Sequence, residues 1–324
     1  MAVPLRARAR RTLRSHAIRI LVRLVSLLPL PIAFRVGAAA GALGHLLLRR
    51  TRALALRQLA LAFPERGEGE RRRIAREMFL SLGRAAAEVT AIRSYDHRLE
   101  AYAELGDPGL LAEVMARGKG MVYVTGHLGN WELMARRIAR AGVPNAVIAK
   151  RGGDGRLMDL IAAWRAEGGV TTLWREEPDT GRAIIRTFRQ GRALGILVDQ
   201  DTSVQGVFVP FFGRLAHTPR AAGDLALRFG APVVVGTIHR KGPRPTDGHL
   251  LELTEIPYDP APADREAEVI RITAACQAAL EATIRRFPAE WVWMHQRWKT
   301  RPEDVSARKM PESRAVGGGS DRPS

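Results

Sequence analysis

The stretch that decides the fold is Met121-Val-Tyr-Val-Thr-Gly-His-Leu-Gly-Asn-Trp-Glu132. It begins with a short β-rich run that carries no charge, passes through a turn with two glycines, and ends in residues that begin a helix. This order predicts a buried strand, a turn and a first helical turn, with His127 at the carboxyl end of the strand. In open α/β sheets, ligands bind at that edge.

The same alternation of strand and helix continues along the chain. Further β-rich runs occupy residues 146–149, 170–173, 194–198, 233–238 and 250–256, and amphipathic stretches at 130–141, 156–166, 179–189, 219–229 and 263–286 separate or follow them. Two more helical patterns, at 49–63 and 70–92, precede the first strand. This pattern predicts an α/β domain with a mostly parallel sheet flanked by helices.

The N-terminal segment combines apolar and basic residues. No Asp or Glu occurs before Glu65. Residues 17–48 are strongly apolar but are interrupted by Arg19, Arg23, Arg35, Pro29 and Pro31. Because no run of about 18 apolar residues is clean, a helix lying in the membrane interface is favoured over a membrane span. A secretory signal, or a pair of helices packed on the domain, remains an alternative.

These features divide the chain into three parts. We expect a basic, apolar, membrane-associated segment at residues 1–50 and an α/β domain at residues 51–302. Residues 303–324, rich in Gly, Ser and charge, are expected to be disordered.

Charge and cysteine content limit the classes of function. The formal net charge of +18 over 324 residues favours a polyanionic partner, such as nucleic acid, an anionic membrane, a phosphorylated lipid or an acidic carrier protein. The sequence contains no zinc-finger spacing, aromatic RNA-binding motif or recognisable helix-turn-helix, so a nucleic-acid-binding protein is the weaker alternative. Cys276 is the sole cysteine, which excludes an intramolecular disulfide and a cysteine-based zinc site.

His127 and Glu132 are the candidate catalytic pair. Five positions separate them, and the glycine turn could fold the imidazole back toward the carboxylate. Neutral His127 would remove a proton from a hydroxyl that attacks a thioester, while Glu132 would orient the ring and stabilise the imidazolium. Thioesters are already activated, so we expect neither a metal nor a cofactor. A surface salt bridge or a helix cap would show the same spacing.

The wider sequence resembles the lipid A late acyltransferases of the glycerolipid acyltransferase superfamily, whose signature is His-x4-Asp or His-x4-Glu. The resemblance covers roughly residues 49–302. It rests on His127-Leu-Gly-Asn-Trp-Glu132, Leu61-Ala-Phe-Pro-Glu65, Asp199-Gln-Asp201 with Phe211-Phe-Gly213, Thr218-Pro219, Ala231-Pro-Val-Val-Val235 and Trp293-Met-His-Gln-Arg-Trp298.

The resemblance implies roles for particular residues. His127 and Glu132 carry over as the catalytic pair, and Arg165 and Asp199 as substrate-binding residues. From their chemistry alone, Arg165 could hold a phosphate or brace a carboxylate, and either residue could instead form an ion pair that shapes a loop. Lys150 and Arg151 follow a predicted strand and could meet a lipid phosphate, although a solvated loop explains them equally well.

The resemblance also implies a reaction and a location. We expect an O-acyltransferase that moves a fatty acyl chain from acyl carrier protein or coenzyme A to a hydroxyl of a lipid A precursor, at the cytoplasmic face of the bacterial inner membrane. The segment that follows Ala149, Lys150-Arg-Gly-Gly-Asp-Gly155, lacks the Asn-Pro typical of many lipid A enzymes. Phosphatidylinositol mannosides, other glycolipids and lysolipids therefore stay open as acceptors.

Overall fold

A seven-stranded sheet forms the centre of the protein. The computed structural model describes residues 20–152 and 155–304. The strands lie in the order β1-β9-β8-β2-β5-β3-β4, and every neighbouring pair is parallel except β8 and β9. Their bounds are β1 Ala103–Leu105, β2 Met121–Thr125, β3 Asn145–Ala149, β4 Val170–Trp174, β5 Ala193–Leu197, β8 Val233–Arg240 and β9 His249–Ile256. The predicted α/β class with a mostly parallel sheet is confirmed.

Helices cover both faces of the sheet. Because side chains alternate along a strand, Met121 and Tyr123 of β2 pack against one layer, and Val122 and Val124 against the other. The first layer contains α5 Leu99–Tyr102, α6 Pro108–Ala116, α7 Trp131–Arg140 and α8 Gly155–Glu167. The second contains α9 Thr180–Arg189, α10 Ala221–Phe229 and α11 Arg265–Arg286, where Cys276 is buried.

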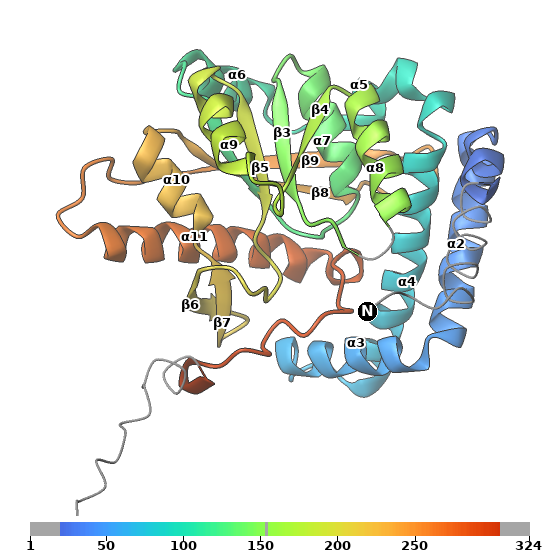
Figure 1. Ribbon diagram of the computed structural model, residues 1–324. Helices are drawn as coiled ribbons and strands as arrows, with labels where there is room; N and C mark the ends of the chain where they lie inside the picture. Colours follow the sequence, from blue (N-terminus) through green and yellow to red (C-terminus); the bar gives the residue numbers. More distant parts are fainter. Residues whose placement is uncertain (1–19, 153–154, 305–324) are drawn as a thin grey trace, which may run out of the picture.

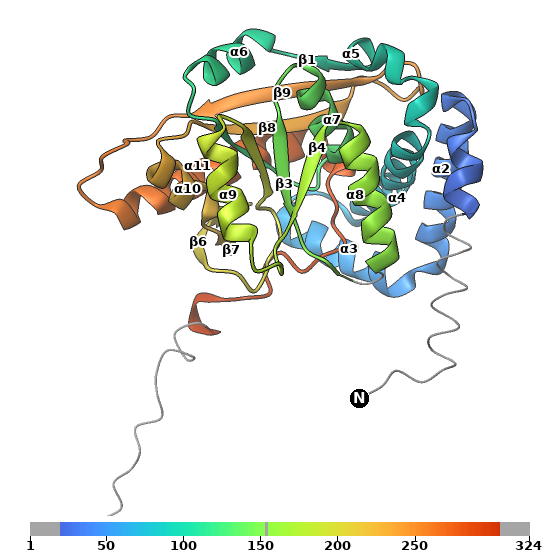
Figure 2. The same cartoon turned by 45° about the horizontal axis from the view of Figure 1, so that its top comes forward.

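Helices α2 Leu30–Leu47, α3 Arg49–Ala62 and α4 Glu68–Thr90 lie before the sheet in the chain. Helices α2 and α4 lie side by side along one edge of the molecule (Figure 2). Their backbones approach so closely that a Cβ at Gly37, Gly41 or Gly83 would strike the opposite helix. Helix α2 is long and apolar enough to cross a membrane, although it also packs on α4.

A third cluster of buried side chains lies beside the carboxyl edge of the sheet. The segment Trp291–Trp298, called here the C-terminal strap, lies with α3 at the lower edge of the molecule in Figure 1. Trp291 and Trp293 are fully buried there among side chains of α3 and α4. Arg297 anchors the strap, because its backbone N–H donates to Gln58 and its guanidinium donates to the carbonyl of His217.

The same cluster includes the hairpin of β6 Gly206–Phe211 and β7 Arg214–Pro219. Residues 206–211 and 214–219 pair as two antiparallel strands. Val209 and Phe211 are fully buried, so the apolar side chains of this stretch serve core packing.

Most predicted elements agree with the observed bounds to within two or three residues. The short strand β1 and helix α6 were not predicted, since neither carries a long periodic pattern. The tail beyond residue 304 and the first 19 residues lie outside the described residues, and the proposed division at residues 50 and 302 stays a prediction.

Candidate active site

His127 lies just beyond β2 and bonds to a buried carboxylate that follows β5. Its ring Nδ1 is 2.9 Å from Oδ1 of Asp199, and its backbone N–H donates to Oδ2 of the same side chain at 2.6 Å. Because β2 and β5 are parallel neighbours, their carboxyl ends bring these two residues together. Nε2 of His127 has no hydrogen-bond partner among the described residues.

Asp199 is held by the C-terminal strap as well as by His127. The indole N–H of Trp291 donates to Oδ2 of Asp199 at 2.8 Å, and Nε2 of His295 lies 3.1 Å from its backbone oxygen. The side chain is fully buried. The carboxylate therefore has little freedom to move, and its position determines the orientation of the His127 ring.

The electrostatic environment favours a charged pair. Burial opposes ionisation of His127, but the charge and hydrogen bond of Asp199, with a contribution from Glu132, raise its pKa above the ordinary value. Burial likewise opposes ionisation of Asp199, but its contacts with His127 hold the pKa of the carboxyl well below the usual range. An imidazolium at His127 is thus stabilised by a neighbouring carboxylate.

Glu132 has a different partner from the one the sequence suggests. It lies in the first turn of α7, and Arg165 of α8 clasps its carboxylate, Nε donating to Oε2 at 2.8 Å and Nη2 to Oε1. The prediction of a hydrogen bond between His127 and Glu132 is wrong, because Asp199 bonds to the ring and Glu132 acts on it only through its charge. Arg165 braces this carboxylate, one of the two uses its chemistry allows.

A narrow cavity opens beside this ion pair, between α7 and the sheet. Glu132 and Arg165 line it, together with mostly apolar or small side chains of α7, β2, β3 and β5. These wall residues include Met134, Ala135, Ile138, Val147, Ile148, Gly195 and Leu197. A charged pair beside a mostly apolar lining suits a ligand with a polar reacting group and a hydrocarbon chain.

Lys150 and Arg151 follow β3, at the same sheet edge as His127. Arg151 forms ion pairs with Asp159 and Glu177 and covers the Trp174 ring. Lys150 forms no ion pair with any residue that the structure describes. Arg151 thus shapes the exposed loop beyond the strand, and contact of either residue with a substrate stays a prediction.

Comparison with known proteins identifies the family. The family model described as bacterial lipid A biosynthesis acyltransferase matches residues 5–300. The chain belongs to this family. It is therefore an acyltransferase, whose substrates are an acyl donor and a lipid acceptor. The resemblance stated from the sequence motifs is confirmed.

Individual acyltransferases align over most of the chain. The lipid A biosynthesis lauroyltransferase of Escherichia coli (strain K12) is 30% identical over 290 residues, covering 88% of this chain and 91% of that protein. The palmitoleoyltransferase of the same organism is 26% identical, covering 86% and 89%. A phosphatidylinositol mannoside acyltransferase of Mycolicibacterium smegmatis (strain ATCC 700084 / mc(2)155) is 24% identical, covering 69% and 71%.

Sequence reasoning did not assign Trp291 or His295 to the site of this acyltransferase. Trp291 is buried in the core. The clustering of aromatic residues and a histidine in the strap was the available signal, but only the tertiary structure brings the strap to Asp199.

Proposed function

We propose that this acyltransferase moves a fatty acyl chain from a thioester to a hydroxyl of a phosphorylated glycolipid, with a lipid A precursor as the first candidate acceptor. The observation that carries the proposal is the ring of His127, oriented by Asp199 with Nε2 left free. Such a ring is suited to remove a proton from an attacking hydroxyl.

The proposed reaction needs no group beyond the protein and its two substrates. Nε2 of His127 takes the hydroxyl proton while the oxygen attacks the thioester carbonyl. Asp199 stabilises the imidazolium, as the carboxylate does in a Ser-His-Asp triad. The carbon–sulfur bond then breaks, and the imidazolium returns the proton to the departing thiolate.

Glu132 and the cavity are assigned complementary roles. We place the acyl chain against the apolar lining of the cavity, with its thioester beside the ion pair of Glu132 and Arg165. Glu132 contributes its negative charge to the site, which favours the protonated form of His127. Arg165 fixes that charge in place, and Lys150 and Arg151 are candidates for contact with the acceptor at the same sheet edge.

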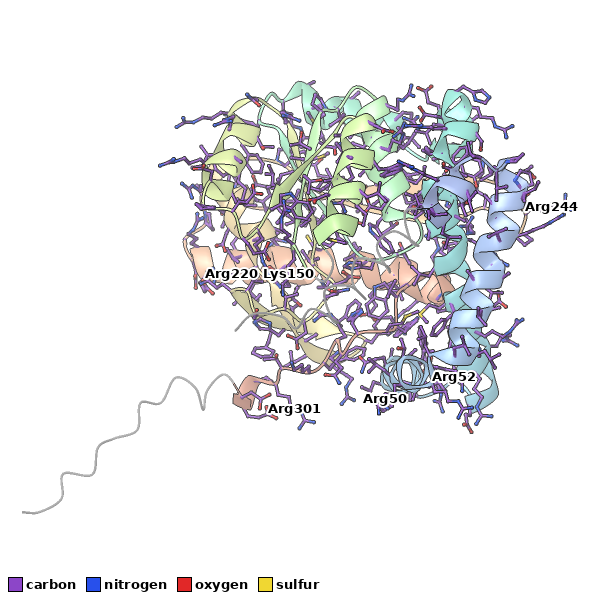
Figure 3. All side chains as sticks on the ribbon, turned by 45° about the vertical axis from the view of Figure 1, so that its right-hand side comes forward. Arg50, Arg52, Lys150, Arg220, Arg244 and Arg301 are labelled. Carbon is purple, nitrogen blue, oxygen red and sulfur yellow. The ribbon has the colours of Figure 1, made fainter. Side chains whose placement is uncertain are left out.

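The side chains of the N-terminal helices support the proposal that the enzyme acts at a membrane surface. Of the twelve large apolar side chains that are exposed in the described chain, ten lie between Ile20 and Leu48. Arg50 and Arg52 project from α3 near the foot of α2 (Figure 3). Apolar side chains next to arginines suit the interface of an anionic bilayer. We therefore place the enzyme on the cytoplasmic face of the inner membrane.

The donor is proposed to be acyl carrier protein or coenzyme A. Both carry negative charge, and a protein with a net charge of +18 attracts an acidic partner. The two donors can be separated by supplying the same acyl chain on each carrier and comparing kcat/KM.

Mass spectrometry of the lipid product tests the proposal. Purified protein is incubated with acyl carrier protein loaded with a fatty acid and with a lipid A precursor, and the gain of one acyl chain is measured. His127→Ala should abolish the gain, whereas His97→Ala, which alters an exposed histidine outside the site, should not. An equal gain with His127→Ala would refute the mechanism.

A phosphatidylinositol mannoside is the second candidate acceptor, because the phosphatidylinositol mannoside acyltransferase of Mycolicibacterium smegmatis aligns with 69% of the chain. The same assay with this lipid in place of the lipid A precursor separates the two. An acyl gain on the mannoside alone would move the acceptor assignment and leave the roles of His127 and Asp199 intact.

A further inference from the structure

A charged cluster lies inside the protein, away from the cavity. Glu88 of α4 is fully buried, and the guanidinium of Arg240, at the end of β8, clasps its carboxylate with bonds of 2.6 and 2.7 Å. Nε2 of His249 lies 3.2 Å from the same carboxylate, and the hydroxyl of Tyr102 donates to it at 2.6 Å. A buried charge with this many partners is held in one position.

Asn130 connects this cluster to the catalytic turn. Its side-chain Nδ2 donates to Oε2 of Glu88 at 3.0 Å and lies 3.3 Å from the backbone oxygen of Ala85. Its Oδ1 accepts the backbone N–H of Leu133, so Asn130 also caps α7. One side chain thereby ties α4 to the turn between His127 and Glu132.

The other side of the turn is held by the C-terminal region. The N–H of Gly129 donates to the carbonyl of Glu290, and the N–H of Val292 donates to the carbonyl of His127. Gly129 has a positive φ of 59°, and a Cβ there would strike the carbonyl of Ile238. These contacts fix the backbone on the C-terminal side. On the opposite side, the hydrogen bond between Asn130 and Glu88 fixes the position of the turn relative to α4.

We propose that Asn130 and Glu88 are positioning residues for acyl transfer, which hold the turn so that His127 meets Asp199 and Glu132 meets Arg165. The kinetic test of this inference rests on the proposed function, whereas the hydrogen-exchange test does not. Neither side chain touches the cavity, so both act through the turn.

Asn130→Asp is the sharpest test. The new carboxylate still caps α7 but faces Glu88, which its neighbours keep ionised. Burial raises the pKa of Glu88, yet contacts with His249 and Arg240 outweigh this and hold it well below the ordinary value. The charged and titratable groups that interact with Glu88 are Arg240, His249, Tyr102, Tyr95 and Arg84, and Glu290 interacts with the same two arginines.

Two neighbouring carboxylates cannot both ionise without repulsion, so the introduced group has a raised pKa. Below that pKa it is protonated and can donate to Glu88, and above it the turn is pushed away. The ratio of kcat for Asn130→Asp to kcat for the wild type should therefore fall as pH rises. At about pH 8 we expect a loss on the order of 10²-fold, the effect of displacing a reacting group by about 1 Å.

Two further variants separate positioning from capping. Asn130→Ser keeps a cap for α7 but cannot reach Glu88, so it should lower kcat by a ratio that does not change with pH. Asp107→Asn changes the cap of α6, and should match the wild type at every pH. A constant ratio for Asn130→Asp across the pH range would overturn the proposal.

Hydrogen exchange supplies a readout that needs no substrate. In Asn130→Asp, the amides of residues 127–133 should exchange faster than in the wild type at about pH 8, because the turn is displaced. Unchanged protection would overturn the proposal. If the wild type transferred no acyl chain to any lipid tested, the proposed function would fail while faster exchange would still support the positioning role.

Discussion

Replacing Asp199 by asparagine should disable His127 by changing which ring nitrogen carries the proton. Two N–H groups, from the His127 backbone and the Trp291 indole, donate to Oδ2. An asparagine at this position keeps both bonds if its oxygen takes the place of Oδ2. Its NH2 group then lies where Oδ1 was, 2.9 Å from Nδ1 of His127.

That arrangement reverses the direction of the ring hydrogen bond. The amide donates to Nδ1, so the ring proton moves to Nε2, and the nitrogen that should accept the hydroxyl proton no longer can. General-base catalysis contributes about 10² to 10⁴ in rate, and a comparable tautomer error in a serine protease triad costs about 10⁴. We expect the kcat of Asp199→Asn to be about 10² to 10⁴ times lower than that of the wild type.

The pH profile gives a second, independent sign. The base must be neutral, so kcat/KM of the wild type should fall as pH drops through the pKa of His127, which Asp199 and Glu132 hold above the ordinary value. Removing the Asp199 charge destabilises the imidazolium and lowers that pKa. The acid limb of any remaining activity should therefore move to lower pH.

Steady-state acyl transfer, measured by mass spectrometry of the lipid product across pH, checks both effects. Asp201→Asn is the matched control, because Asp201 is buried two residues away and its hydrogen bonds go to Thr300. It should keep the wild-type profile. Asp199→Asn with wild-type kcat and an unmoved acid limb would refute the role assigned to Asp199.

Three other predictions address the ion pair, the cavity and the membrane surface. Arg165→Lys loses the planar two-point contact with Glu132, and should lower kcat/KM by up to about 10²-fold, as measured by steady-state kinetics. Ala135→Leu fills part of the cavity, and should shift the preference toward shorter acyl donors when kcat/KM is compared across a chain-length series. Leu47→Glu places a charge on the exposed apolar surface of α2, and should weaken cosedimentation with anionic vesicles by about tenfold or more, from the loss of about 1.5 kcal/mol of apolar burial.

The cavity and membrane-surface predictions each have a control in the same chain. Ala139→Leu, one turn further along α7 and outside the cavity lining, should leave chain-length preference unchanged. Ile270→Glu alters an exposed apolar side chain on α11 and should leave vesicle binding unchanged. Equal vesicle binding by Leu47→Glu and the wild type would count against membrane docking through α2. Unchanged kinetics for Arg165→Lys would show that the ion pair of Arg165 and Glu132 plays no part in acyl transfer.

Much of the candidate site could be predicted from the sequence because parallel strands end at a common edge of the sheet. His127, Lys150 and Asp199 each follow a predicted strand, so their placement at one edge required only the alternation of strands and helices. The sequence could not show that Asp199 bonds to His127 while Glu132 pairs with Arg165, since these contacts depend on β5 lying next to β2 and on α8 reaching α7.

The sequence by itself determined the α/β class, the limits of most strands, the acyltransferase family and the histidine at the strand end. The class and the strands follow from local periodicity, and the family follows from short motifs, each contained in a few consecutive residues. Only the tertiary structure decided which carboxylate orients His127, that the strap fastens Asp199, and that Glu88 holds the turn from α4. These contacts join residues 42 to 92 positions apart, and no local pattern records a pairing over that distance.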